Sequence, residues 1–155
     1  MREVIKAVID TSVFIAAIKS KSETSGPVKI VSTCNDGSFK IVTSPQIMEE
    51  LVRKLIEYKY DSELITNFIA HIKVDAITTS GLYCTERLSN IDPKDNMILS
   101  TAYESSSDFI VTLDSKHILP IKHFCGTQII DPSSFIREVQ AAKSEVRQSI
   151  QTMIF

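Results

Sequence analysis

Two aspartates follow apolar stretches of the chain that have the composition of buried β-strands. Asp10 comes directly after Val4–Ile9, and Asp114 ends the stretch Asp108–Asp114. β-Branched and other apolar residues dominate both stretches, which is typical of strands covered on both faces. The carboxyl end of a strand in an open parallel sheet is where such proteins bind their ligands. Both aspartates are therefore candidates for chemistry.

Further carboxylates occur at two predicted helix starts. Ser44–Pro45 is a capping hydroxyl followed by proline, and it places Glu49 or Glu50 in the first turns of a helix. Asp92–Pro93 is a second such start, where either its aspartate or Asp95 would lie at the opening of the helix. The amino ends of helices that follow parallel strands face the same edge as the strand ends. One acid from each helix start is thus expected to join the two strand-end aspartates.

Three or four carboxylates at one edge repel one another unless a divalent cation lies between them. Oxygen ligands suit Mg²⁺ or Mn²⁺, and such an ion holds a phosphate and lowers the pKa of a bound water. The set therefore predicts metal-assisted phosphodiester hydrolysis. Taken singly, each acid has a structural explanation, because the helix macrodipole stabilises a first-turn carboxylate by ~0.3–1 kcal/mol and Asp is a favoured N-cap. The combination of helix-start and strand-end acids favours the metal site.

Strands and helices alternate along the chain. The strands predicted after Val4–Ile9 are Phe39–Thr43, Val74–Ile77, Asp108–Asp114 and Gly126–Ile130. The helices are predicted to follow Asp10 and to begin at Pro27, Ser44–Pro45, Ser62, Asp92–Pro93 and Asp131–Pro132. This alternation predicts an α/β fold with a central parallel sheet sandwiched between helices.

Three predicted helices carry apolar stripes at three- or four-residue steps, which marks their buried sides. The stripe of the helix after Ser44 is Ile47, Leu51, Leu55 and Tyr58. In the predicted helix Ser62–Ile72, the residues expected on the buried side are Leu64, Ile65, Phe68, Ile69 and Ile72. The stripe of the final helix is Phe135, Val139, Ala142, Val146, Ile150 and Met153.

Composition indicates one ordinary domain over residues 1–155. The chain is 43% hydrophobic with a net charge of −2, so nucleic-acid binding must rest on a local patch or on metal ions. No leader-like segment or bilayer-length apolar run occurs, so no membrane partner and a cytoplasmic location are expected. Cys34, Cys84 and Cys125 predict packed, reduced thiols and no zinc site, because none forms a CxxC pair. None of the three histidines has metal-ligand spacing to the cysteines.

Five motifs carry a resemblance to a known family. They are Val-Ile-Asp-Thr-Ser-Val at 8–13, Ser-Pro-Gln-Ile-Met-Glu-Glu-Leu at 44–51, Asp-Pro-Lys-Asp-Asn-Met-Ile-Leu-Ser-Thr-Ala at 92–102, Val-Thr-Leu-Asp at 111–114 with Lys116–His117, and Ile-Asp-Pro-Ser-Ser-Phe at 130–135. In order and spacing they resemble the PIN-domain ribonucleases, and among these the toxins of toxin–antitoxin pairs similar to the VapC group. The resemblance covers nearly the whole chain.

The resemblance implies an endonuclease that cleaves RNA with Mg²⁺ or Mn²⁺, forms a homodimer and is inhibited by a small antitoxin. By motif position the catalytic and metal-binding acids are Asp10, Glu50, Asp95 and Asp114. The family often has Asn two residues after the first Asp, where this chain has Ser12, whose hydroxyl can still hydrogen-bond a carboxylate. Asn96 and Thr112 are expected to help orient the acids.

Other functions fit the sequence less well. A haloacid-dehalogenase-like phosphatase needs a second Asp two residues after the first, at the position of Ser12, and a dinucleotide-binding protein needs a GxGxxG turn, which the four glycines do not form. A non-catalytic RNA-binding or RNA-processing module on the same fold would lose acids, whereas all four positions are filled here. The final helix, residues 132–155, is expected either to form an interface or to pack along its own domain.

Overall fold

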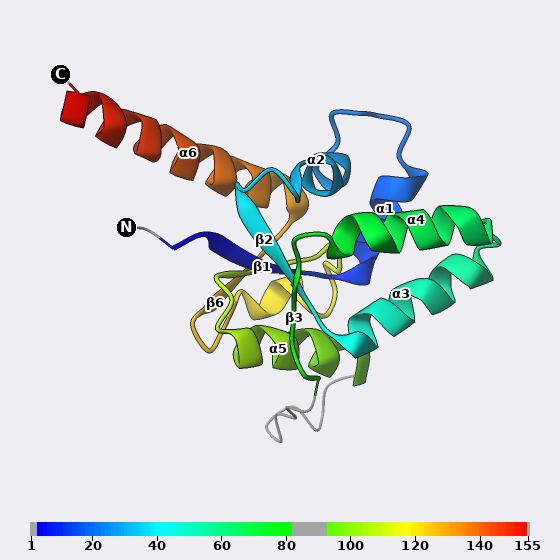
Figure 1. The fold of residues 1–155 in the computed structure, drawn as a ribbon. Coiled ribbons are helices and arrows are strands. Elements are labelled where there is room, and N and C mark those ends of the chain that lie inside the picture. Colours follow the sequence, from blue (N-terminus) through cyan, green and yellow to red (C-terminus); the bar gives the residue numbers. More distant parts are fainter. Residues whose placement is uncertain (1–2, 82–92, 155) are drawn as a thin grey trace.

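The computed structural model describes residues 3–81 and 93–154, and a mostly parallel sheet runs through their centre (Figure 1). Its strands are β1 (Ile5–Ile9), β2 (Phe39–Thr43), β3 (Ile77–Thr78), β4 (Phe109–Val111), β5 (His123–Phe124) and β6 (Thr127–Ile130). They are ordered β3-β2-β1-β4-β6-β5, and only the β5–β6 pair among them is antiparallel. The predicted α/β fold is confirmed. The antiparallel edge strand was not expected.

Helices cover both faces of the sheet. They are α1 (Thr11–Lys19), α2 (Gly26–Thr33), α3 (Pro45–Glu57), α4 (Ser62–Lys73), α5 (Pro93–Ser105) and α6 (Pro132–Ile154). α5 packs against β1, β2 and β4, while α2 and α6 contact each other on the opposite side of the sheet (Figure 1). Among the described helices, none combines the length and the apolar character needed to cross a membrane.

The helix starts predicted from capping residues are present. The Ser44 hydroxyl accepts a hydrogen bond from the backbone N–H of Ile47 at 3.2 Å, and Asp131 accepts one from Ser134 at 2.8 Å. Each side chain thereby satisfies an amide that the helix cannot pair internally. Ser44 matters most for function, because its cap fixes where α3 begins and hence the position of the glutamates in that helix.

The predicted strand Gly126–Ile130 is half of a hairpin whose other half is β5. The two strands are joined by Cys125 and Gly126, both with positive φ, 49° and 85°. Two successive positive φ values are typical of the tight turn that matches strand twist. The hairpin escaped prediction because cysteine is an unusual residue at such a position, where Asn or Asp would have signalled the turn.

β4 is shorter than the predicted Asp108–Asp114. The Thr112 N–H still donates to the Ile130 carbonyl of β6 (3.1 Å), but the next two amides leave the ladder. The Leu113 N–H donates to the Ser12 hydroxyl (3.3 Å) and the Asp114 N–H to the Thr112 hydroxyl (3.0 Å). In this position Asp114 lines the same cavity as Asp10.

Several apolar residues predicted to be buried are exposed. Tyr58 and Leu64 are 53% and 39% exposed, and Val74, predicted to begin a strand, ends α4 instead and is 72% exposed. The Tyr58 ring lies under the Lys19 ammonium, 3.7 Å from its centroid, so it packs on a cation rather than in the core. Leu64 lies at the edge of a groove described below.

The final helix packs on its own domain only over its first half. Phe135 and Val139 are buried, whereas Val146, Ile150, Met153 and Ile154 are 49%, 49%, 86% and 67% exposed. Figure 1 shows the end of α6 projecting beyond the rest of the domain. Of the two alternatives, packing along the domain therefore applies to the first half of α6 only, because the helix is longer than the surface that it covers, and the interface role of its second half stays a prediction.

Phe135 fastens α6 to the sheet, and its loss should be costly. The fully buried ring makes edge-on contacts with Phe39 (5.0 Å between centroids) and Phe109 (5.7 Å). Phe135→Ala should lower the free energy of unfolding by about 3–5 kcal/mol, since both burial and packing are lost. Denaturant unfolding would measure this. Ile56→Ala on α3, where the side chain is 61% exposed, is the control and should change the value by no more than about 0.5 kcal/mol.

Candidate active site

Asp10 is held rigidly between β1 and α1. Its backbone N–H donates to the carbonyl of Val111 at 2.9 Å, which extends the pairing of the two central strands by one residue. Its carboxylate accepts hydrogen bonds from the hydroxyls of Thr112 (2.7 Å) and Ser12 (3.0 Å), both on Oδ2. Although Asp10 stands at the N-cap position of α1, its side chain caps no helix amide. Helix capping therefore does not explain this aspartate.

Asp114 is fixed by the turn that follows β4. Its Oδ1 accepts hydrogen bonds from the backbone N–H groups of Lys116 (3.1 Å) and His117 (3.0 Å), and its own N–H donates to Thr112 Oγ1. Thr112 thus donates to one strand-end aspartate and accepts from the other. The side chain of Asp114 is only partly exposed and keeps its second oxygen, Oδ2, 3.4 Å from His117 Nδ1.

Glu50 projects from α3 with unusually little exposure for an acid. Only 10% of its side chain is exposed, and its buried Oε1 has no hydrogen-bond partner. The ammonium groups of Lys54 and Lys94 lie 3.5 and 3.8 Å from that oxygen. Glu49 lies at the exposed surface, so the structure favours Glu50 over Glu49 as the acid of this helix.

Asp95, in the first turn of α5, completes the group. One potential ligand atom each of Asp95, Asp114 and His117 lies within 4.8 Å of the others. Asp92, the alternative acid at this helix start, lies outside the described residues. His117 was not predicted, because only its distance from the cysteines was considered. Its spacing of three residues from Asp114 was the signal that could have indicated it.

The four acids line one cavity of about 300 Å³. Its walls are formed by Asp10, Thr11, Ser12, Glu50, Lys54, Lys94, Asp95, Asp114 and His117. The convergence expected from the sheet topology is therefore found in the structure. Of the three residues expected to orient the acids, Ser12 and Thr112 bond to Asp10, whereas the Asn96 carbonyl accepts a hydrogen bond from Ser100 within α5 (3.0 Å).

The donor set of this acid cavity fits a hard divalent cation. Carboxylate oxygens with one imidazole suit Mg²⁺ or Mn²⁺, and a buried carboxylate oxygen without a hydrogen bond is otherwise costly. Glu50 Oε1 is such an atom, and three further acids line the same cavity, although only Asp95, Asp114 and His117 bring ligand atoms within 4.8 Å of one another. A cation among these residues would relieve the repulsion between them and satisfy the unpaired oxygen.

The comparisons with known proteins agree with this arrangement. Residues 6–116 match the PIN domain family, a span that contains all four acids. The chain belongs to the PIN domain family. In three dimensions the PIN domain is similar to a chain in a crystal structure of VapBC2 from Rickettsia felis bound to a DNA fragment from their promoter, at 14% identity and a TM-score of 0.58, covering 82% of this chain and 98% of that one. No curated protein sequence matches the chain.

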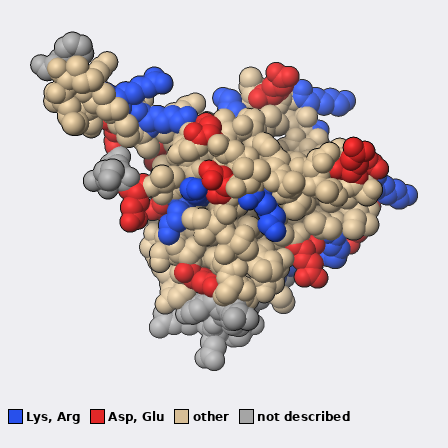
Figure 2. Space-filling view, viewed as in Figure 1, with Lys and Arg blue, Asp and Glu red and all other residues tan. Residues whose placement is uncertain are grey.

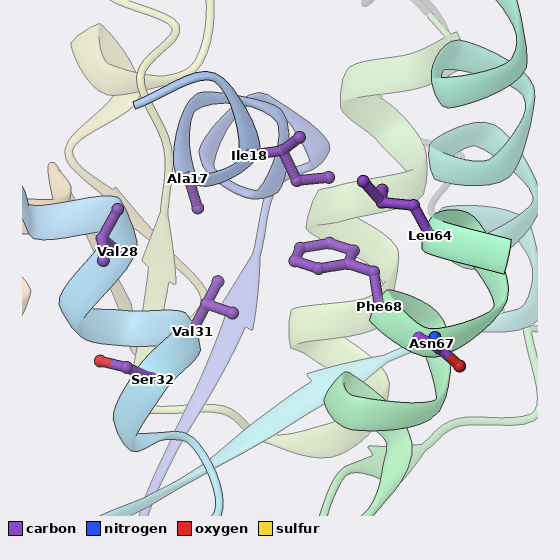
Figure 3. A pocket seen from close by; sticks show the side chains of 8 residues that line it. All are labelled: Ala17, Ile18, Val28, Val31, Ser32, Leu64, Asn67 and Phe68. Atoms are coloured by element: carbon purple, nitrogen blue, oxygen red, sulfur yellow. The ribbon is translucent and has the colours of Figure 1, made fainter. Parts of the chain in front are cut away.

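A second, apolar groove lies between α1, α2 and α4 of the PIN domain (Figure 3). Its volume is about 540 Å³, and its lining contains no charged side chain. Ile18 of α1 and Leu64 and Phe68 of α4 point toward one another across it, and Val31 closes it from α2. The groove is larger than the acid cavity but has no group that could perform hydrolysis.

Neither described cysteine lines the acid cavity or the apolar groove. Burial raises the pKa of the Cys34 thiol to about 11, so it stays protonated at neutral pH. Cys34 is packed as expected, whereas Cys125 is exposed in the β5–β6 turn, contrary to the prediction. Cys84 lies outside the described residues.

Thr112 should be central to holding the two strand-end acids. Thr112→Val keeps the shape but leaves the Asp10 carboxylate without one donor and the Asp114 amide without its acceptor. We expect the free energy of unfolding to fall by about 1–3 kcal/mol. Urea unfolding would measure the change. Thr112→Ser retains the hydroxyl and should stay closer to the wild type; equal stability of Thr112→Val and wild type would contradict this role.

Proposed function

We propose that this PIN domain is a ribonuclease that hydrolyses RNA phosphodiester bonds with Mg²⁺ or Mn²⁺ and serves as the toxin of a toxin–antitoxin pair. The observation that carries the nuclease proposal is the acid cavity, which is lined by four acids and in which the nearly buried Glu50 keeps an oxygen that accepts no hydrogen bond. Members of the family are typically nucleases, and these acids stand at the positions of its motifs.

Asp10, Glu50, Asp95 and Asp114 would hold the cation in this proposal. When bound, it supplies a water of lowered pKa and neutralises charge on the phosphate. Ser12 and Thr112 keep the Asp10 carboxylate directed into the cavity through their hydrogen bonds to Oδ2. The backbone amides after Asp114 hold its Oδ1, which leaves Oδ2 at the His117 side.

A non-catalytic RNA-binding or RNA-processing module is the alternative. Such a module gains nothing from bringing four acids to one cavity, because their mutual repulsion costs free energy. The charge distribution bears on both functions. On the face in Figure 2 the basic and acidic side chains are interspersed, in keeping with the net charge of −2, so RNA contacts should depend on local groups.

Asp10→Asn should abolish RNA cleavage without unfolding the protein. The amide keeps the shape of the side chain but removes the charge that would bind the cation. The loss should exceed the roughly 10–100-fold typical of residues that only orient a metal ligand. RNA cleavage with Mn²⁺, and after EDTA, would measure it; undiminished cleavage by the variant or after chelation would refute the metal mechanism.

Asp108→Asn is the matched control for that experiment. Asp108 precedes β4 at the opposite end of the strand from Asp114, is exposed, and accepts a hydrogen bond from the Lys6 amide (2.9 Å) that Asn can retain. Full activity of this control would show that loss of an aspartate charge elsewhere on the sheet does not matter.

Two apolar surfaces support protein partners for the proposed toxin. We propose that an antitoxin segment occupies the groove between α1, α2 and α4, where Leu64 is 39% exposed and no charged side chain lines the wall. The similarity to the VapBC2 structure supports an antitoxin partner, and the apolar lining is the reason for placing it in this groove. The projecting part of α6, with Val146, Ile150, Met153 and Ile154, is proposed as the contact of a homodimer.

Removing the projecting part of α6 should separate self-association from folding. A chain ending at Ala142 keeps the buried Phe135 and Val139, so its melting temperature should hardly change while the homodimer is lost. Sedimentation and thermal melts would test both. Leu64→Asp, which places a charge at the groove instead, should leave self-association intact; a truncated chain that still dimerises would rule out the interface role of α6.

A further inference from the structure

The acid cavity contains a basic group that a carboxylate metal site does not explain. Lys54 lines the cavity together with the four acids, and a lysine beside a metal ligand repels the cation. Its presence therefore weakens metal binding. A role other than metal binding must account for a cation at this place.

Lys54 is held in position by α3. It lies one helical turn after Glu50, and the neighbouring Leu51 and Leu55 are fully buried, which fixes the face of the helix. Its side chain is 27% exposed, and its ammonium donates to Thr11 Oγ1 at 3.2 Å. The Thr11 hydroxyl in turn donates to Asp10 Oδ1 at 3.4 Å. The Lys54 ammonium is thus linked to Asp10 through Thr11 and lies close to Glu50 on its own helix.

The contact between Lys54 and Glu50 is close but not hydrogen-bonded. Nζ lies 3.5 Å from Oε1, and that oxygen has no hydrogen-bond partner. A lysine whose task was to neutralise a buried glutamate would be expected to donate to it, because an unpaired buried oxygen is costly. The Lys94 ammonium and the Arg53 guanidinium lie farther away, at 3.8 and 3.9 Å, so none of the three basic groups prevents a metal ion from binding this oxygen.

An RNA strand brings phosphates to a cavity dominated by negative charge. A phosphate needs a cationic group of the protein as well as a metal, because the four acids would otherwise repel it. Lys54 is enclosed within the cavity wall, whereas the Lys94 side chain is 58% exposed. Of these two lysines, Lys54 is the one fixed deep enough to meet a phosphate beside the acids.

We propose that Lys54 is a substrate-binding residue of this nuclease: its ammonium stands beside Glu50 in the metal-free protein and contacts a phosphate oxygen of the RNA when a divalent cation binds the acids. The inference rests on the proposed function and adds a substrate contact to it. If the proposal holds, Lys54 lowers the affinity of the acids for the metal ion and raises the affinity of the protein for RNA. A purely structural ion pair with Glu50 would not raise the affinity for RNA.

Lys54→Met tests both effects in the full-length protein. Without RNA, Mn²⁺ titration calorimetry should show severalfold tighter binding, since a like charge is removed beside Glu50. With Ca²⁺ in place of Mn²⁺, under conditions where a gel shows no cleavage, anisotropy of a labelled single-stranded RNA should show roughly tenfold weaker binding. The slope of log affinity against log salt should fall by about 0.7, the value for one phosphate contact on a single strand.

Lys73→Met and Lys54→Arg are the matched variants. Lys73 is the last residue of α4, is exposed and does not line the acid cavity, so its loss changes the charge equally but should leave RNA affinity and the salt slope near wild type. Lys54→Arg retains the charge and should keep the wild-type slope. The comparison thereby separates the location of the charge from the net charge of the protein.

The inference is overturned if Lys54→Met binds RNA with the wild-type affinity and salt slope, or if it loses Mn²⁺ affinity. Either result would make Lys54 a structural support of Glu50. Failure of the proposed nuclease function is seen separately, in the wild type alone, as absence of Mn²⁺-dependent RNA cleavage. Both RNA affinity and Mn²⁺ affinity are compared between variants without requiring turnover.

Discussion

Four carboxylates share a cavity of about 300 Å³, and their mutual repulsion is the constraint to which the rest of the domain is adapted. The acids are brought together by the topology, because strand ends and helix starts meet at one edge of a parallel sheet. They are then kept there by separate supports. Thr112 and Ser12 donate to Asp10, two backbone amides donate to Asp114, and α3 carries Glu50 into the interior.

The supports differ in what they leave available. Asp114 Oδ1 is occupied by backbone amides, whereas Glu50 Oε1 accepts no hydrogen bond and has the cationic groups of Lys54, Lys94 and Arg53 at 3.5, 3.8 and 3.9 Å. The site therefore combines an acid fixed by hydrogen bonds with one held only by ion pairs, which leaves Glu50 the more open of the two to a metal ion.

The acid cavity and the apolar groove are separate in chemistry but share one short helix. Thr11 and Ser12 at the start of α1 line the acid cavity, while Ala17 and Ile18 near its end line the groove. α1 begins directly after Asp10, so the proposed antitoxin site rests on the same element as the proposed metal site. A nine-residue helix is short enough for both ends to be bordered by functional surfaces.

The sequence by itself determined the alternation of strands and helices and the four places where acids would meet, because period, caps and strand-end position are local properties. Helix periodicity alone did not distinguish Glu49 from Glu50, which only the motif position favoured, because both lie in the same turn and only packing buries one of them. Tertiary structure also decided which groups surround His117 and Lys54 and how far Leu64 and Ile150 are exposed. Apolar periodicity shows which residues could be buried, but only the extent of the covering surface decides which of them are.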